Sequence, residues 1–261
     1  MKWVRFRRGD EAGFGTVEGE FVHRHAGEMF AAPQPTGDRI PLTDVEWLPP
    51  AQPTKIVGLW NNFRAAAAKN GWAEPAEPLY FLKSPGAVAA HGQNIPAPKS
   101  YDGRVAYEGE LAIVIGRTAR AVQVADSLTH VFGYTCANDL TALELLNRDP
   151  AFAQWTRAKS FDGFAPLGPI IETDFDFSRA TLRTRVGGRE RQNFPLADMF
   201  FSPAELVARI SRDVTLEPGD VILCGTSLGV LPMKPGTEVE IEIDGIGTLR
   251  NRIVGVHGEV A

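Results

Sequence analysis

Apolar residues recur along the chain mostly in the patterns of strands. Nearly continuous apolar runs at 55–59, 79–82, 105–115 and 131–137 are typical of strands buried on both faces. Helical spacing is confined to short segments near 61–70, 126–130, 140–147 and 203–212. We therefore expect an α+β fold that is mostly β. The other predicted strands are 3–7, 15–18, 20–23, 170–171, 181–186, 192–194, 221–224 and 238–243.

Proline, glycine and capping signals divide the chain. The segment Pro49-Pro50-Ala51-Gln52-Pro53-Thr54 reads as a stiff linker, so we predict a small N-terminal β region over 1–54 and a main domain over 55–261. Gly187-Gly188 and Asp244-Gly245 predict two-residue hairpin turns. Ser202-Pro203-Ala204-Glu205 predicts a capped helix start. The stretch 160–169 is too rich in glycine and proline to predict regular structure.

Two carboxylates begin one of the continuous apolar runs. Glu108 and Glu110 project from the same side of the predicted strand 105–115, which is apolar on both faces beyond them. Burying an unpaired charge costs several kcal/mol or more, so a cation should lie between them. A divalent metal is one candidate, and an ion pair at the mouth of the strand is the alternative.

The same spacing occurs in a different setting nearer the end of the chain. Glu238, Glu240 and Glu242 alternate with valine and isoleucine, which is the pattern of a strand with one face in water. The Glu-x-Glu spacing alone therefore does not indicate a site. The doubly apolar surroundings of Glu108 and Glu110 make the difference.

Three further residues stand at the ends of predicted buried strands or beside a loop. Asp139 follows strand 131–137 and is either a helix N-cap or a third carboxylate at the same sheet edge. Lys83 ends strand 79–82, and Lys159 precedes the glycine-rich stretch. Each lysine is either a surface residue whose ammonium reaches water or a contact for an anion.

Composition excludes several classes of protein. The 261 residues carry a formal net charge of −5, which gives no electrostatic case for binding nucleic acid. No apolar run reaches the length of a signal peptide core or a membrane span, so we expect no membrane association. Cys136 and Cys224 are isolated in apolar contexts, which favours reduced thiols and a cytoplasmic location.

One motif suggests a different chemistry. Gly225-Thr226-Ser227-Leu228-Gly229 has the Gly-x-Ser-x-Gly form of a serine hydrolase nucleophile elbow, and Asp244 and His257 follow in the matching order. The elbow requires a helix after the serine, but Pro232 and Pro235 follow too soon. We therefore reject a serine hydrolase using Ser227 but keep it as a testable rival.

Four motifs follow one another along the chain: Tyr107-Glu108-Gly109-Glu110, Tyr134-Thr135-Cys136-Ala137-Asn138-Asp139, Arg157-Ala158-Lys159-Ser160-Phe161-Asp162-Gly163 and Leu223-Cys224-Gly225-Thr226-Ser227-Leu228-Gly229. Taken together, they resemble the fumarylacetoacetate hydrolase superfamily. The resemblance covers about residues 55–255 and implies a mixed β-sheet roll, usually a homodimer. It also implies that Glu108, Glu110 and Asp139 bind Mg²⁺ or Mn²⁺, with Lys159, Lys83 and Thr226 near the substrate.

The chain departs from that family in one place. Hydrolytic members carry a histidine and an acid on a lid helix to activate water, and the matching stretch 61–71 has neither. Loss of a general base costs hydrolysis about 10²–10⁴-fold, which favours reactions without attacking water. We expect decarboxylation or enol–keto isomerisation of a small-molecule 2-oxo acid, with Lys159 and Glu108 catalytic and Arg64 on the lid pairing with a second carboxylate. The alternatives are a C–C bond hydrolase of a diketo acid and a non-enzymatic carboxylate-binding module.

Overall fold

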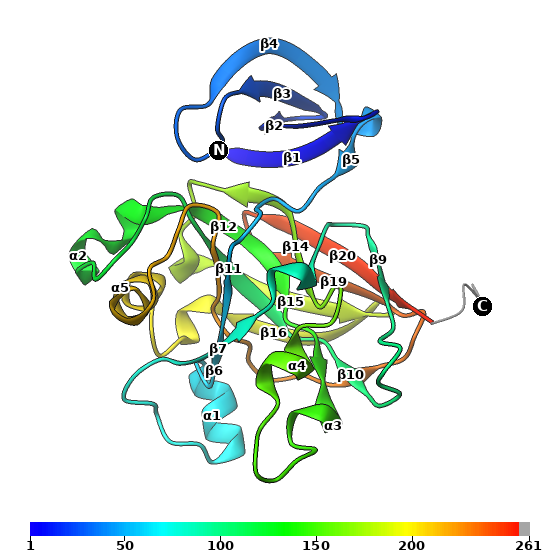
Figure 1. Cartoon of the computed structure of the whole chain (residues 1–261), viewed down its shortest axis with the longest axis vertical. Coiled ribbons are helices and arrows are strands. Elements are labelled where there is room, and N and C mark those ends of the chain that lie inside the picture. Colours follow the sequence, from blue (N-terminus) through cyan, green and yellow to red (C-terminus); the bar gives the residue numbers. More distant parts are fainter. Residues whose placement is uncertain (256–261) are drawn as a thin grey trace.

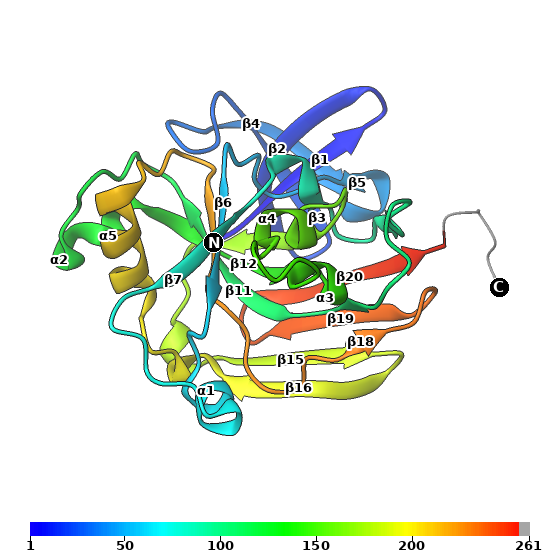
Figure 2. The same cartoon turned by 60° about the horizontal axis from the view of Figure 1, so that its bottom comes forward.

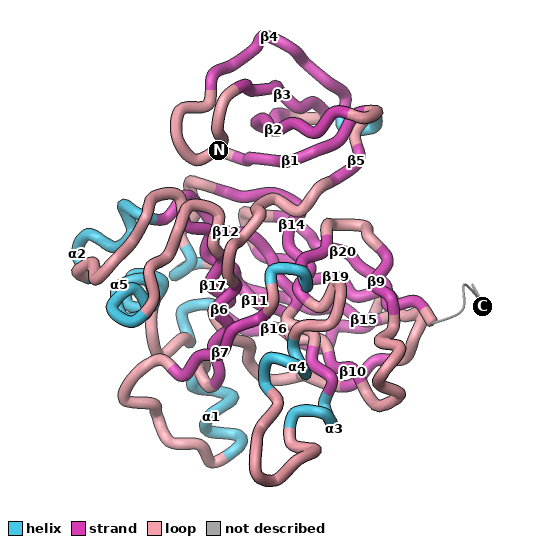
Figure 3. The backbone as a smooth tube through the Cα atoms, in the orientation of Figure 1, coloured by secondary structure: helices cyan, strands magenta, loops and turns pink. Residues whose placement is uncertain are grey.

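The computed structural model describes residues 1–255 and is built mainly of strands in mixed sheets, as predicted (Figure 3). Residues 256–261, which include His257, lie outside the described residues. The helices are α1 (Arg64–Asn70), α2 (Val124–Ser127), α3 (Leu143–Leu146), α4 (Trp155–Lys159) and α5 (Pro203–Asp213). The strands are β1 (Lys2–Arg8), β2 (Glu11–Glu18), β3 (Phe21–Ala26), β4 (Gln34–Pro41), β5 (Glu46–Trp47), β6 (Ile56–Trp60), β7 (Leu79–Lys83), β8 (Val88–Ala89), β9 (Asn94–Pro96), β10 (Val105–Ala106), β11 (Gly109–Ile115), β12 (Val131–Asn138), β13 (Thr141–Ala142), β14 (Ala165–Glu172), β15 (Thr181–Val186), β16 (Arg189–Pro195), β17 (Val221–Leu223), β18 (Pro232–Met233), β19 (Glu238–Ile243) and β20 (Gly247–Val254).

Three sheets organise the chain. The largest has the strand order β4-β3-β2-β1-β14-β12-β11-β17-β6-β7, with β5 and β8 paired to it at the side. A second sheet has the order β16-β15-β19-β20-β9, and the short strands β13, β10 and β18 form a third. Most pairs are antiparallel, while β17–β6, β8–β14 and β9–β20 are parallel. Figure 2 shows β20, β19, β15 and β16 of the second sheet side by side, and residues of both sheets, such as Leu111 and Ile241, belong to one hydrophobic core.

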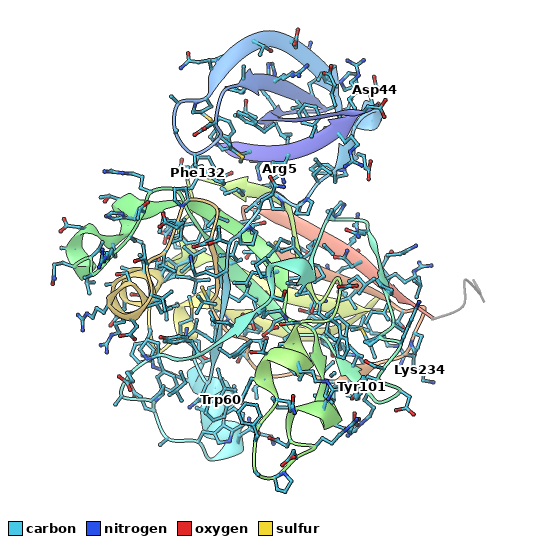
Figure 4. All side chains as sticks on the ribbon, viewed as in Figure 1. Arg5, Asp44, Trp60, Tyr101, Phe132 and Lys234 are labelled. Carbon is cyan, nitrogen blue, oxygen red and sulfur yellow. The ribbon has the colours of Figure 1, made fainter. Side chains whose placement is uncertain are left out.

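The N-terminal strands β1–β5 form a compact unit against the rest of the chain (Figure 1). It joins the large sheet through β1, where Lys2 and Trp3 pair with β14. Arg5 and Phe132 mark the junction in Figure 4, and the Arg5 guanidinium donates to the carbonyl of Pro49 over 2.8 Å. The small unit therefore extends the main sheet rather than standing apart from it.

The central strand predicted over 105–115 is interrupted. The chain leaves the β10 pairing at Tyr107 and Glu108 and enters the large sheet as β11 at Gly109. Every residue of β11 is buried, as its apolar pattern predicts. The interruption moves Glu108 to the point where two sheets meet.

Strand β7 does not have the predicted burial. Leu79, Tyr80 and Leu82 are 38%, 37% and 43% exposed, although the apolar run indicated a strand buried on both faces. The reason is its position at the end of the large sheet, where β6 is its only pairing strand within residues 1–255. Sequence pattern reports apolar character, not which strand lies at the edge.

In two irregular regions the structure contains strands that the sequence did not predict. The stretch 160–169 contains the start of β14 at Ala165, and its pairing with β12 shifts register between Tyr134 and Cys136. That irregularity accommodates Pro169, which has no N–H for a regular ladder. Strand β4 was not predicted because six of its eight residues are exposed and it lacks an apolar alternation.

Most of the predicted turns and caps are confirmed. Gly187 and Gly188 form the predicted hairpin turn with φ of 57° and 74°, and Ser202 and Glu205 form the predicted capping box. The last hairpin closes through three residues, 244–246, rather than two. In β19 the three glutamates lie on the wetter face, as predicted, and they pair with arginines. Within residues 1–255, no helix is both long and apolar enough to cross a membrane.

Candidate metal centre and active site

Three carboxylates from two segments of the chain converge at one place. Glu108, Glu110 and Asp139 each offer an oxygen, and these oxygens lie within 4.8 Å of one another. The antiparallel pairing of β11 with β12 brings them together, and the N–H of Asp139 donates to the carbonyl of Glu108 over 2.9 Å. Asp139 is not a helix N-cap, because α3 begins only at Leu143 and its N-cap position is Ala142.

Two lysines neutralise much of this charge. The Lys159 Nζ lies 2.9 Å from Oε2 of Glu108 and 2.6 Å from Oδ2 of Asp139. The Lys83 Nζ pairs with Oδ1 of Asp139 and also donates to the carbonyl of Phe164 over 2.9 Å. Lys83 is therefore a buried counter-ion of Asp139, while Lys159 bridges two of the three carboxylates.

Exposure separates the members of the cluster. The side chains of Asp139 and Lys83 are 0% exposed, that of Lys159 is 3% exposed, and that of Glu108 is 16% exposed. Glu110 is also fully buried. Glu108 is thus the carboxylate of the cluster that reaches solvent, and it is the one best placed to meet a molecule from outside.

Burial and neighbouring charges set the protonation of these groups. Burial, followed by the charges of Asp139 and Glu108, holds the pKa of Glu110 well above its ordinary value. Burial also raises the pKa of Glu108, against the opposing effect of Lys159. For Asp139, burial favours the neutral form, but Lys159 and Lys83 outweigh it and lower the pKa. Burial likewise works against the charge of Lys159, but the surrounding carboxylates raise its pKa, so it remains an ammonium.

The donor set fits a hard divalent cation. Oε2 of Glu110 accepts the N–H of Gly225 over 2.7 Å, whereas its Oε1 is buried without a hydrogen-bond partner in the part of the chain that the structure describes. A buried carboxylate oxygen without a donor is costly, and a cation would satisfy it. Oxygen ligands alone suit Mg²⁺ or Mn²⁺.

Of the other two residues predicted to contact the substrate, Thr226 lies beside the carboxylate cluster and Arg64 does not contact it. The Thr226 hydroxyl lies beside the cluster and donates to the carbonyl of Gly109 over 2.8 Å. Arg64 begins α1, where its Nη1 donates to the carbonyls of Asp198 and Met199 and its guanidinium lies 5.0 Å from the centre of the Phe200 ring. The structure does not pair Arg64 with the carboxylate cluster.

Three polar residues at the site were not predicted from the sequence. The Thr141 hydroxyl donates to Oε1 of Glu108 over 2.5 Å, and Oδ1 of Asn138 accepts the N–H of Glu108 over 3.0 Å. Gln192 reaches Gly109 from the second sheet. Thr141 and Asn138 flank Asp139 in sequence, which was an available signal, but nothing in the sequence connects Gln192 to the cluster.

Aromatic side chains flank Lys159. Its Nζ lies 5.1 Å from the centre of the Phe81 ring, and Phe81 stacks on Trp155 with centroids 5.1 Å apart. Trp60, labelled in Figure 4, lies 6.5 Å from Trp155 and 4.9 Å from Trp72. An aromatic surface therefore extends from the lysine toward α1.

Neither a water-activating pair on α1 nor a serine triad is present among the described residues. Helix α1 carries alanines between Arg64 and Lys69 and has no histidine or acid. Ser227 lies in a loop rather than before a helix, and its hydroxyl has no hydrogen-bond partner among the residues described. Asp244 pairs with Arg183 over 2.6 Å, and His257 lies outside the described residues.

Comparison with known proteins identifies the relatives of this chain. The family model for the fumarylacetoacetate (FAA) hydrolase C-terminal region matches residues 55–254, and an Rv2993c-like N-terminal model matches residues 1–50. An oxaloacetate tautomerase of Bacillus subtilis is 37% identical over 218 residues, which cover 78% of this chain and 71% of that protein. A 4-hydroxyphenylacetate degradation bifunctional isomerase/decarboxylase of Salmonella dublin is 39% identical over 202 residues, which cover 76% of this chain and 46% of that protein.

Solved structures have the same fold. A 5-carboxymethyl-2-hydroxymuconate delta-isomerase of Mycobacterium smegmatis is 38% identical, with a TM-score of 0.90 over 98% of this chain and 100% of that one. A maleylpyruvate hydrolase of Sphingobium, in complex with manganese(II) and pyruvate, is 26% identical, with a TM-score of 0.79 over 98% of this chain and 100% of that one. The chain therefore belongs to the fumarylacetoacetate hydrolase family, and it is an enzyme.

Proposed function

We propose that this enzyme catalyses enol–keto isomerisation or decarboxylation of a small 2-oxo carboxylic acid. The observation that carries the proposal is the buried convergence of Glu108, Glu110 and Asp139 with Lys159 where β11 begins and β12 ends. The isomerase, tautomerase and decarboxylase activities of the named relatives support the same class of reaction. Hydrolysis remains the alternative, but α1 supplies no histidine or acid to activate water.

The three carboxylates are the residues that would hold Mg²⁺ or Mn²⁺. The all-oxygen donor set supports this assignment, and so does Oε1 of Glu110, which has no hydrogen-bond partner among residues 1–255. When bound, a divalent cation supplies electrophilic stabilisation of negative charge on a substrate oxygen. The Sphingobium relative, which is a hydrolase, was solved with manganese(II) and pyruvate, so a cation and a 2-oxo acid are compatible with the fold.

The residues of the chain have distinct proposed roles. Lys159 stays an ammonium because its carboxylate neighbours raise its pKa, so it would bind the anionic end of the substrate rather than remove a proton. An enol–keto interconversion moves one proton from oxygen to carbon. Glu108 is the proposed carrier of that proton, because it is the carboxylate of the cluster that reaches solvent.

Three further residues would support binding. Thr226 would line one side of the substrate site, because its hydroxyl bonds to Gly109, the residue between two of the carboxylates. Lys83 would act from behind Asp139 and hold it in place, because its ammonium is fully buried. The proposed contact of Arg64 with a second carboxylate requires that it leave the carbonyls of Asp198 and Met199.

The assembly and location are also proposed. We expect a homodimer, because the exposed apolar residues of β7 lie at an unpaired sheet edge of the kind that proteins usually cover. The buried free thiols of Cys136 and Cys224 are consistent with a cytoplasmic location, which stays a prediction.

A panel of oxaloacetate, acylpyruvates and hydroxy-heptadienedioates tests the proposed function. Each compound is incubated with Mg²⁺ or Mn²⁺ while carbon dioxide release and the ultraviolet absorbance of the enol are followed in parallel. We expect either carbon dioxide release or the change in enol absorbance to report turnover of at least one compound, and we expect a chelator to abolish that turnover. Cleavage of an acylpyruvate into two acids, without isomerisation or carbon dioxide release, would instead establish the hydrolase.

A further inference from the structure

Gly109, the residue between the first two carboxylates, is fixed through both of its backbone polar groups. Its N–H donates to Oε1 of Gln192 over 2.9 Å, and its carbonyl accepts the hydroxyl of Thr226 over 2.8 Å. The two side chains also bond to each other, with Nε2 of Gln192 2.9 Å from Oγ1 of Thr226. The peptide that separates Glu108 from Glu110 is therefore enclosed by a closed ring of hydrogen bonds.

The orientation of the Gln192 amide is determined by its partners. The N–H of Gly109 can only donate, so the amide oxygen must face it. The Thr184 hydroxyl donates to the same oxygen over 2.8 Å. The amide nitrogen then faces Thr226 and the carbonyl of Leu228, which lies 3.3 Å away. Gln192 is 1% exposed, so no solvent replaces these bonds.

The hydrogen bonds among Gln192, Thr226 and Gly109 join two sheets beside the carboxylate cluster. Gln192 lies in β16 and Thr184 in β15, both in the second sheet, whereas Gly109 begins β11 in the large sheet. The packing is close: a Cβ at position 109 would lie 2.3 Å from Oγ1 of Thr184 and 2.9 Å from Cδ2 of Leu182. Because Gly109 has no side chain, β15 and β16 can lie this close to the start of β11, and the Gln192 amide fills the space between them.

We propose that Gln192 is a positioning residue that sets the separation of the Glu108 and Glu110 carboxylates, and so the affinity of the site for a divalent cation. The proposal rests on the proposed function, in which these carboxylates hold the cation. Gln192 acts through the Gly109 backbone and through the Thr226 hydroxyl, and in this proposal it touches neither ion nor substrate itself. Outer-shell residues, which hold metal ligands in place without binding the ion, typically contribute about 10–100-fold to metal affinity or activity.

The test measures Mn²⁺ binding to chelator-treated protein by calorimetry, with thermal unfolding recorded on the same samples. Gln192→Met retains the length of the side chain and removes its hydrogen bonds. We expect it to weaken Mn²⁺ binding about 10–100-fold and to lower kcat more than it changes KM. The neighbouring Asn193→Ala is the control, because Asn193 is exposed and its side chain bonds only to Glu190 among the described residues.

A second variant covers the case in which Gln192→Met does not fold. Thr184→Val has nearly the same shape but loses the hydroxyl that orients the amide of Gln192, and we expect a smaller decrease in Mn²⁺ affinity in the same direction. Lower thermal stability with unchanged Mn²⁺ affinity in the folded variants would overturn the positioning role and leave a structural one. Absence of Mn²⁺ binding by the parent protein would instead contradict the proposed function.

Discussion

Lys159 and Asp139 form a buried ion pair, with 2.6 Å between Nζ of the lysine and Oδ2 of the aspartate. The same ammonium lies 2.9 Å from Glu108, the carboxylate of the cluster that is 16% exposed. Lys159 thus contacts a buried ligand candidate and the solvent-facing one at once. The Lys159 ammonium is therefore placed to offset the charge of the cluster and, in the proposed function, to bind the anionic end of the substrate.

Replacing Lys159 should separate catalysis from metal binding. Lys159→Met removes the ammonium from beside Glu108 and Asp139. We expect kcat to fall about 10²–10³-fold, as for the loss of one electrostatic donor, while Mn²⁺ affinity is not reduced because a competing positive charge has gone. Steady-state kinetics and calorimetry measure the two effects. Lys234→Met, at an exposed position, is the control, and an active Lys159→Met enzyme would remove Lys159 from the mechanism.

Lys83 should matter mainly for stability. Its side chain and that of Asp139 are both 0% exposed, so Lys83→Met leaves a buried carboxylate without one of its counter-ions. We expect the free energy of unfolding to fall by about 3–5 kcal/mol, measured by chemical denaturation. Adding Asp139→Asn should restore part of that loss because the uncompensated charge disappears. A change no larger than that of the exposed Lys69→Met would show that the buried pair does not stabilise the fold.

Glu110 should stabilise the protein only when a cation is present. Its pKa is raised by burial and by Asp139 and Glu108, and one of its oxygens has no partner in the described structure. In chelator-treated protein, Glu110→Gln should therefore raise the free energy of unfolding by about 1–3 kcal/mol, because an amide can accept from Gly225 and donate toward the neighbouring carboxylates. Lower stability of the metal-free variant would contradict this account of the charge cluster.

The β7 edge provides a test of the expected homodimer. Leu82 is 43% exposed at the end of the large sheet, so Leu82→Glu should shift the protein toward a monomer in sedimentation velocity. Leu128→Glu is a matched control, since Leu128 is 46% exposed in a short helical turn outside the sheet. A dimer unaffected by Leu82→Glu would place the interface elsewhere, and a parent protein that sediments as a monomer would rule the homodimer out.

The sequence was sufficient for what depends on local pattern. Continuous apolar runs located β6, β11 and β12, and the contrast with Glu238–Glu242 separated Glu108 and Glu110 from a wet strand face. It could not show that β7 is an edge strand, because an apolar run does not report which strands pair with it.

Contacts between residues far apart in the sequence could not be predicted either. Gln192 meets Gly109 across 83 positions of the chain and from another sheet, and no local pattern encodes that meeting. The same limitation applies to Lys83, whose burial follows from Asp139, Leu140 and Phe164 closing around its ammonium. Tertiary packing, rather than residue type, decided that this strand-end lysine is a buried counter-ion.

The most direct test is a calorimetric titration of chelator-treated protein with Mn²⁺, comparing the parent, Glu110→Gln and Glu238→Gln. Glu238 has the same Glu-x-Glu spacing on an exposed strand face and pairs with Arg252, so it controls for loss of one carboxylate. We predict one Mn²⁺ per chain for the parent and Glu238→Gln. In Glu110→Gln we predict that binding is weakened by more than the about 10–100-fold that loss of an outer-shell partner of a metal ligand typically costs. Equal affinity in all three proteins would contradict a cation site built from Glu108, Glu110 and Asp139.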